Sequence, residues 1–251
     1  DLRHLGEAKL KERLPQIYEL AVEYLGVDPA KAPIPVLPAV HYTMGGITAD
    51  GRTAAPLAGL YSAGECSSVG IHGANRLGSN SLTELLVFGR RAALSAIAHL
   101  QSGLPASKGA ALAAKAKASQ DRIQTLFDKS NGTESIAGLR QEMMDTMEAN
   151  VGIYRTGEGL AAACEKISEL RQRYANIALT DKIHVYNTDL MQALELGSML
   201  DCAEAVTVGA RDRKESRGAH QRLDFTARDD ENLLKHSLAH YHPTEPPRIE
   251  Y

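Results

Sequence analysis

Apolar side chains recur at helical spacing across the first 24 residues of the chain. This period predicts one helix over Asp1–Tyr24 with a single apolar face. The residues on that face are Leu10, Leu14, Ile17, Leu20, Ala21 and Tyr24. Four prolines between Pro29 and Pro38 follow, and they exclude a helix because proline lacks the backbone N–H. An extended connector is therefore expected there.

The next segment has the pattern strand, glycine-rich loop, helix. The short apolar run "GLYSAGE", Gly59–Glu65, predicts a buried strand, and a glycine-rich loop follows over Ser67–Gly78. "SLTE" at Ser81–Glu84 matches a capping box, in which the serine and the glutamate satisfy each other's free backbone donors. A helix is expected from there to about Leu100.

Helical periodicity dominates after Pro105. Segments near 107–129, 133–150 and 157–176 are amphipathic and are joined by short loops, which predicts an antiparallel bundle of three helices. One face of the third segment carries Leu160, Cys164, Ile167, Leu170 and Tyr174. A further helix is expected from Asn187-Thr188 to near Gly209, followed by a polar tail, Arg217–Tyr251, with short strands.

The composition argues against several classes of protein, among them nucleic-acid-binding and membrane-spanning proteins. The chain has 251 residues, 43% of them hydrophobic, which is enough for a sizeable core. Its net charge of -3 gives no sign of the basic surface that binds nucleic acid. Cys66, Cys164 and Cys202 are unclustered, which suits a reducing compartment and gives no metal-ligand spacing. No apolar run reaches the roughly 20 residues of a membrane span, and no signal peptide is visible. Because the chain begins with Asp1 rather than Met, we expect it to be a piece of a longer protein.

The glycine-rich segment predicts an anion site. A helix N-terminus exposes unpaired N–H groups and a partial positive charge, and Gly70, Gly73 and Gly78 would let the backbone approach a ligand. No dinucleotide-binding G-x-G-x-x-G and no Walker motif is present. Glu65, at the end of the expected strand, could bind a ribose hydroxyl or could cap a turn, and the pattern does not decide between them.

Arg76 and His41 carry the candidate chemistry. A guanidinium in apolar surroundings favours a planar anion such as a carboxylate, and a histidine can add a further donor. A structural ion pair for Arg76 and a core hydrogen bond for His41 are the alternatives. Beside a glycine-rich turn, the two together favour a small-anion site.

Three motifs carry a family resemblance: "HYTMGGI", "GLYSAGECSSVGIHGANRLGSNSLTELLVFGRRA" and "RKESRGAHQRLD". Together they resemble the flavoprotein subunit of the fumarate reductase and succinate dehydrogenase family, and the resemblance extends over essentially the whole chain. It corresponds to the C-terminal part of such a subunit. The N-terminal Rossmann half, the histidine that tethers FAD and the proton-donor arginine of the family fall outside it.

The resemblance implies an α+β, mostly helical fold: the C-terminal part of an FAD-binding domain, then a three-helix bundle and a small irregular C-terminal domain. The implied domains are the end of a capping domain (1–33), the last segment of the FAD-binding domain (34–103), the bundle (104–180) and the C-terminal domain (181–251).

The resemblance also implies roles for individual residues. His41 and Arg76 would bind the substrate carboxylates. No catalytic residue and no metal ligand is expected, because the proton-donor arginine is outside the chain. The implied FAD contacts are His41, Tyr42, Glu65, Arg76, Leu77, Gly78, Ser79, Asn80, Ser81 and Leu82.

The implied activity is reduction of fumarate to succinate by hydride transfer from FAD in anaerobic respiration. This chain alone would be inactive and would bind FAD weakly or not at all. The implied partners are an iron–sulfur subunit and membrane anchor subunits, with a cytoplasmic location on the inner face of the plasma membrane. Succinate dehydrogenase and L-aspartate oxidase are alternatives, and a non-catalytic subunit-docking module is the alternative of another class.

Several motifs receive a structural interpretation. Met143, Met144 and Met147 are expected in the core, and His72 is expected to be structural. The run "ARDRKESRGAH" is expected to be a solvated or interface surface. Surface positions are expected for His236, His240 and His242.

Overall fold

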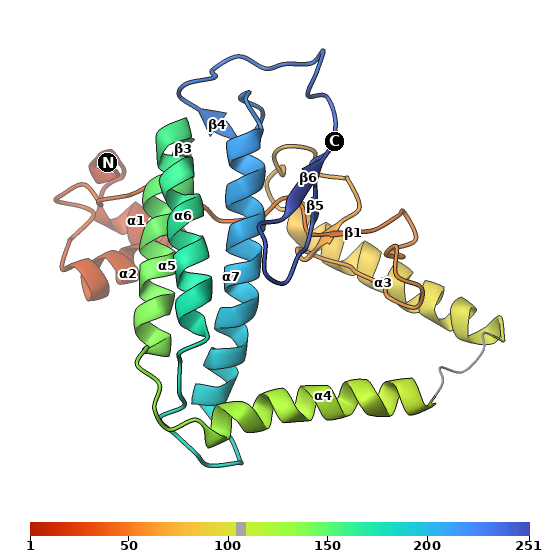
Figure 1. Ribbon diagram of the computed structural model, residues 1–251. Coiled ribbons are helices and arrows are strands. Elements are labelled where there is room, and N and C mark those ends of the chain that lie inside the picture. The colour runs from red at the N-terminus through yellow and green to blue at the C-terminus, as the bar shows by residue number, and fades with distance from the viewer. Residues whose placement is uncertain (104–108) are drawn as a thin grey trace. The chain divides into compact units, whose positions relative to one another are not determined.

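The computed structural model describes residues 1–103 and 109–251. The chain divides into two compact units, Asp1–Ala39 and Val40–Tyr251. Helices dominate both units, and the described residues also contain three two-stranded sheets (Figure 1). The expected α+β, mostly helical class is confirmed.

The first unit contains a 3-10 turn, Arg3–Leu5, and two helices, α1 (Glu7–Arg13) and α2 (Pro15–Leu25). The prediction of one helix over Asp1–Tyr24 is wrong. Pro15 disfavours the helical conformation of the residue before it, and Leu14 has φ -134° and ψ 48°. The proline instead occupies the first turn of α2, where its missing N–H has no cost.

The second unit begins with the glycine-rich segment. Strands β1 (Ile47–Thr48) and β2 (Ser67–Ser68) pair in parallel. The strand predicted over Gly59–Glu65 does not form. A single antiparallel bridge, between Ala54 and Tyr61, is the only pairing of that run within the described residues, and Gly64 turns the backbone with φ +87°. The short apolar run therefore forms a compact loop.

Helix α3 (Asn80–Gln101) confirms the helix expected after the loop, but the capping box is wrong. The residue that precedes the helix is Ser79, in a left-handed conformation with φ 64°, and no side chain of the described residues caps the first turn. Glu84 is unavailable as a cap because its carboxylate binds two side chains outside the helix.

The expected helical segments after residue 108 are present. They are α4 (Gly109–Asp128), α5 (Ile136–Val151), α6 (Gly157–Tyr174) and α7 (Thr188–Asp212). The expected start near 107 and the expected boundary at 104 lie outside the described residues. Side chains of Ser135, Thr156 and Asn187 cap the last three helices, each accepting a hydrogen bond from a first-turn N–H.

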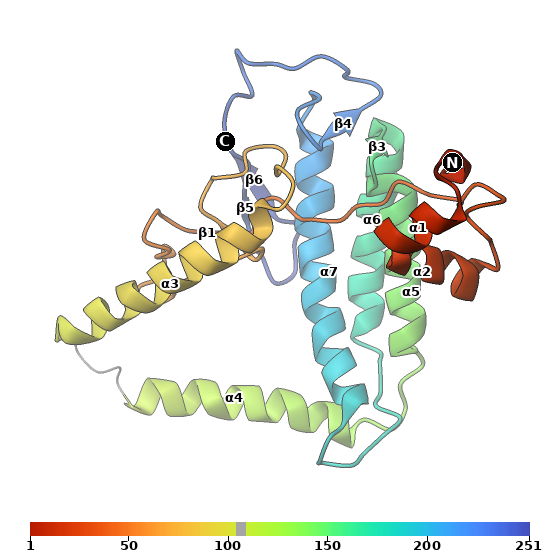
Figure 2. The same ribbon diagram turned by 180° about the vertical axis from the view of Figure 1, so that it is seen from behind.

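The three-helix bundle consists of α5, α6 and α7, which lie side by side in Figures 1 and 2. The expectation that the segment now seen as α4 packs with α5 and α6 is wrong. None of the residues of α4 is buried, because its first turns are mainly alanine and lysine and offer little apolar area. Only its last turn, with Leu126 and Phe127, reaches the core.

The bundle core combines residues from all three helices. Leu139 of α5, Ile167 and Leu170 of α6, and Leu196 and Leu200 of α7 are each at most 1% exposed. The expected apolar face of α6 is thereby confirmed. The three methionines of α5 differ, however, as Met143 is buried and Met147 partly buried, whereas Met144 is 49% exposed and lies outside the core.

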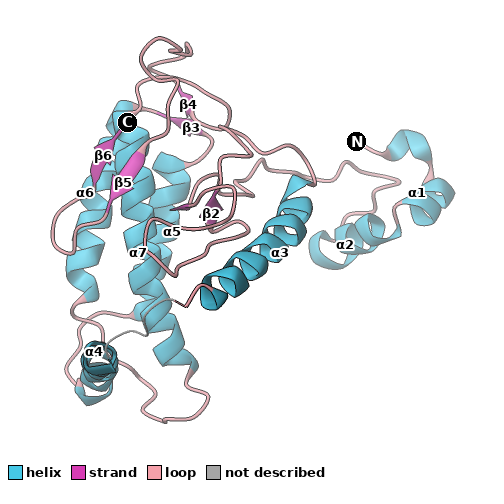
Figure 3. Cartoon of the chain, turned by 90° about the vertical axis from the view of Figure 1, so that its right-hand side faces the viewer, coloured by secondary structure: helices cyan, strands magenta, loops and turns pink. Residues whose placement is uncertain are grey.

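The tail is irregular with short strands, as expected (Figure 3). β3 (Tyr154–Arg155) pairs in parallel with β4 (Gln221–Arg222), and β5 (Leu238–His240) pairs antiparallel with β6 (Arg248–Glu250). The run "ARDRKESRGAH", expected to be a solvated or interface surface, is exposed only in part: Asp212 and Lys214 are exposed, whereas Glu215 is 0% exposed. The three tail histidines are exposed. No helix among the described residues is both long and apolar enough to cross a membrane.

Candidate functional site

A buried glutamate joins three parts of the glycine-rich segment. Glu84, in the second turn of α3, is 2% exposed. Tyr42 Oη donates a hydrogen bond of 2.6 Å to Glu84 Oε2, and His72 Nε2 lies 2.8 Å from the same oxygen. The rings of Tyr42 and His72 meet edge to face, with centroids 5.5 Å apart. One carboxylate therefore fixes the "HYTMGG" segment and the "HGAN" loop to the same helix.

The environment of Tyr42 favours its protonated form. Burial, followed by the hydrogen bond to Glu84, raises the pKa of Tyr42 to about 12. At neutral pH the tyrosine therefore remains a hydrogen-bond donor to the carboxylate, and its ring stays uncharged.

That ring supports Arg76. The guanidinium lies over the face of Tyr42, 4.4 Å from the ring centroid, which is the geometry of a cation–π contact. Arg76 Nη1 donates to the backbone oxygen of Leu77 at 3.1 Å, but Nε is buried and has no hydrogen-bond partner in the part of the chain that the structure describes. A buried donor without a partner is costly, so an acceptor that arrives at this position would be stabilised. The guanidinium is thus oriented, with hydrogen-bonding capacity unused.

The other two predicted polar residues lie nearby in the chain but differ in their contacts. His41 is exposed and directly precedes Tyr42. Glu65 is exposed, and its Oε1 accepts a hydrogen bond of 3.0 Å from the backbone N–H of Thr43. Glu65 therefore ties the "HYTMGG" segment to the end of the "GLYSAGE" run, which agrees with a role as a local cap and leaves its second oxygen for another donor.

The predicted cofactor-binding run, 77–82, forms the entry to α3. Leu77 is 74% exposed and Leu82 is 65% exposed, so two large apolar side chains face away from the chain's own core. The first turn of α3 carries no side-chain cap. An uncapped helix N-terminus presents N–H groups and partial positive charge to an anionic group.

Sequence reasoning did not include Glu84 in the site. It assigned the residue to a capping box because of its spacing from Ser81. A glutamate flanked by "SLT" and "LLVF" is an unusual residue for an apolar helix face, and that signal pointed to a buried partner. His72 was expected to be structural, and its contact with Glu84 agrees with that.

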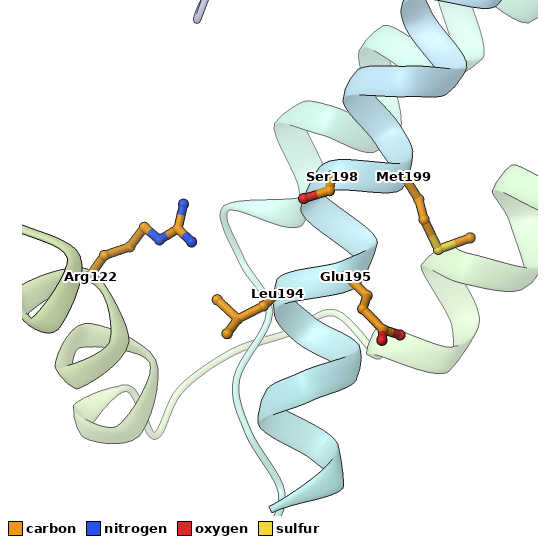
Figure 4. Close-up of a pocket in the computed structure, with 5 residues that line it drawn as sticks. All are labelled: Arg122, Leu194, Glu195, Ser198 and Met199. Carbon is orange, nitrogen blue, oxygen red and sulfur yellow. The ribbon is translucent and has the colours of Figure 1, made fainter. Parts of the chain in front are cut away.

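The described residues form two surface hollows among others, and one of these two adjoins this network. It is lined by Ile71, His72, Asn80, Thr83, Glu84, Val87 and Phe88. The other lies between Arg122 of α4 and one face of α7 (Figure 4). The α7 residues that line it are Leu194, Glu195, Ser198 and Met199. None of the site residues predicted from the sequence lines this second hollow, and Asn80 is the predicted residue that lines the first.

Known proteins are similar to this chain along most of its length. The family model described as "FAD binding domain" matches residues 1–82, and the one described as "Fumarate reductase flavoprotein C-term" matches residues 140–251. The chain is 54% identical to a fumarate reductase flavoprotein subunit of Serratia sp., covering 100% of this chain and 42% of that protein. It is 43% identical to the succinate dehydrogenase flavoprotein subunit of Rickettsia bellii, covering 95% of this chain and 41% of that protein.

A solved structure of a mutated E. coli quinol fumarate reductase superposes on this chain with a TM-score of 0.94 and 50% identity. The match covers 100% of this chain and 43% of the solved one. The chain thus spans about two fifths of the length of these relatives. The two family models match the two ends of the chain, and the listed relatives match 95% or more of its length: the chain belongs to the fumarate reductase and succinate dehydrogenase flavoprotein family.

Proposed function

We propose that the complete protein containing this chain is the flavoprotein subunit of a fumarate reductase, which reduces fumarate to succinate in anaerobic respiration. One observation carries the proposal: Arg76 is held over the ring of Tyr42, its buried Nε has no partner among the described residues, and it lies four residues before the uncapped helix α3 begins at Asn80. This is an arrangement that suits a planar carboxylate next to an anionic cofactor.

FAD fits the residues that are present. The uncapped turn at Ser79–Leu82 would stabilise negative charge on the flavin, and exposed Leu77 and Leu82 offer apolar surface to a ring system. Within the same proposal, Glu65 binds the ribose region, and His41, Tyr42, Arg76, Gly78, Asn80 and Ser81 complete the contacts. When bound, FAD supplies the hydride.

His41 and Arg76 are proposed to hold the two carboxylates of the substrate. Arg76 offers a planar fork of donors, and the Tyr42 ring under it restricts its rotation, so the anion would be oriented as well as neutralised. Glu84 would contribute indirectly, because it accepts the hydrogen bond that holds the Tyr42 ring in place. The chain's own residues thus bind and align the substrate, and the proton donor is proposed to lie in a part of the subunit outside this chain.

Succinate dehydrogenase is the second candidate within the family. The identities favour fumarate reductase, with 54% to the Serratia subunit and 43% to the Rickettsia succinate dehydrogenase subunit. The direct test is to measure fumarate reduction and succinate oxidation by the complete subunit assembled with its partners. Faster fumarate reduction supports the proposal. Succinate oxidation that clearly exceeds it would assign the protein to the dehydrogenase.

We propose that the subunit works with an iron–sulfur subunit and membrane anchor subunits, on the inner face of the plasma membrane. The solved relatives are a quinol fumarate reductase and a Mycobacterium smegmatis succinate dehydrogenase in complex with a quinone, which supports assembly at a membrane. We propose domain limits of 1–33 and 34–103 for the first two domains, whereas the limit at 180 implied by the resemblance falls within the bundle of α5, α6 and α7. A chain that served only for docking would not bind FAD, so a flavin absorption spectrum of the purified complete subunit separates that alternative.

A further inference from the structure

The tail makes a close backbone contact with the loop that carries Arg76. Residues 217–220 form a tight turn, named here the RGAH turn, in which Arg217 and His220 exchange two backbone hydrogen bonds of 2.8 and 3.0 Å. At its tip, the backbone N–H of Ala219 donates to the backbone oxygen of Ala74 at 2.9 Å. In Figures 1 and 2 the chain entering α3 accordingly lies beside the C-terminal end of α7. Ala74 is two residues before Arg76 in "HGANR".

The contact leaves no room for a side chain at Gly218. A Cβ added there would lie 2.4 Å from the Ala74 oxygen and 2.6 Å from its carbonyl carbon, both of which are backbone atoms. Gly218 also has φ +56°, a left-handed conformation that most residues avoid. Two backbones therefore meet directly, and the position of the "HGANR" loop depends on where the RGAH turn is held.

Arg217 anchors one side of the turn to a buried carboxylate. Its Nε and Nη2 donate to the two oxygens of Glu215 at 2.9 and 3.0 Å, and Nη2 also donates to Asp230 at 2.7 Å. Glu215 is fully buried and also accepts from the backbone N–H of Asp229 at 2.9 Å and from Arg213. Such a paired network holds its geometry more firmly than a surface ion pair does.

His220 anchors the other side to the bundle. Its Nδ1 lies 2.9 Å from Arg155 Nη1 and its Nε2 lies 3.0 Å from the backbone oxygen of Arg213, just beyond α7. Arg155 in turn donates to the backbone oxygens of Val151 and Gly152, at the end of α5. A continuous set of contacts therefore runs from two bundle helices through the RGAH turn to the "HGANR" loop.

We propose that the RGAH turn is a positioning element that sets the place of Arg76 at the substrate site through the contact of Gly218 and Ala219 with Ala74. The inference rests on the proposed function for its kinetic consequence, but the contact itself does not. It assigns a task to the "RKESRGAH" motif, which touches neither of the proposed substrate-binding side chains.

The test uses two variants of the complete, flavin-loaded subunit. Gly218→Asn introduces the clashing Cβ while tolerating the left-handed conformation, because asparagine adopts it more readily than other residues do. Ordinary contact with a Cβ begins near 3.4 Å, so the loop must move by about 1 Å, and a misplacement of that size can lower kcat/KM by about 100-fold. Gly26→Asn is the matched control, because Gly26 has φ +65° and nothing within 4 Å of the added Cβ.

Two properties are measured in each variant. The first is hydrogen exchange over residues 70–80, and the second is the KM and kcat for the dicarboxylate, with kcat expressed per bound flavin. Gly218→Asn should speed exchange over that loop and lower kcat/KM by about 100-fold, through a lower kcat as well as a higher KM, whereas Gly26→Asn should change neither. Unchanged exchange and kinetics in Gly218→Asn, or equal changes in both variants, would overturn the proposal.

If Gly218→Asn does not accumulate, Arg217→Lys, which breaks the paired contact with Glu215, must show the same two changes or the proposal fails. A wild-type subunit that is inactive on fumarate and succinate refutes the proposed function, and the exchange result still decides the positioning role.

Discussion

At the residue scale, Arg76 is the side chain whose loss should matter most for activity. Lysine keeps the charge but offers a point charge instead of a planar fork, and it would not lie flat on Tyr42. In the complete subunit we expect Arg76→Lys to lower kcat/KM by roughly two to three orders of magnitude, with a fall in kcat as well as a rise in KM. The measurement is steady-state kinetics of fumarate reduction, normalised to bound FAD.

Arg90→Lys provides the control for this substitution. Arg90 is exposed on α3, in the same helix that follows the site. Its replacement should leave turnover per flavin unchanged. If Arg76→Lys also retained near-normal turnover per flavin, Arg76 would be a structural residue and not a substrate ligand.

At the element scale, the α5–α7 packing makes a stability prediction. Leu170 of α6 is 0% exposed and lies in the core shared by the three helices. Leu170→Ala should lower the free energy of unfolding by about 2–5 kcal/mol, from lost burial and the cavity left behind. Leu112→Ala, at a 58% exposed position of α4, should change it by no more than about 0.5 kcal/mol. Urea unfolding measures both, and similar losses in the two variants would contradict the packing assigned to α4.

The buried carboxylate of the tail gives the second prediction at this scale. Burial alone would raise the pKa of Glu215, but Arg217, the Asp229 N–H and Arg213 lower it to about 2, from an ordinary value of 4.5. The pKa is lower in the folded state, so Glu215 contributes stability above pH 4.5, and this contribution is lost as the pH falls through about 2.

Glu215→Gln should therefore lower the free energy of unfolding at pH 7 and reduce its decline between pH 4.5 and 2. Unfolding by urea at a series of pH values measures this. Glu231→Gln, at an exposed position of the tail, should reproduce the wild-type curve. Parallel curves for wild type and Glu215→Gln would show that ionisation of Glu215 contributes nothing to the pH dependence of the free energy of unfolding.

At the scale of the whole molecule, stability should be unevenly distributed. The bundle helices share a continuous buried core, whereas α4 has no buried residue and the glycine-rich segment has only short strands. Hydrogen exchange should therefore be slowest in α5, α6 and α7 and fast over most of α4. Protection confined to residues 59–78, with rapid exchange across the bundle, would contradict this distribution.

The sequence by itself determined where helices form. Apolar periodicity and the prolines and glycines between segments located α3, α5, α6 and α7 to within a few residues, because these signals are local to the chain. It also singled out Arg76, the family resemblance implied a role for Tyr42, and the fold brings these two side chains together. The break between α1 and α2, which was missed, is also a local effect, since Pro15 restricts the backbone of Leu14.

Only the tertiary structure decided which surfaces meet. An amphipathic pattern states that a helix has a face to bury but not what covers it, so the third helix of the bundle is α7 and not α4. The partners of Glu84 lie 42 and 12 residues away in the sequence, and no local spacing encodes such a contact. For the same reason the charged run around Glu215 looked solvated: a buried carboxylate is stable only with its arginine partners in place, and the folded chain alone supplies that arrangement.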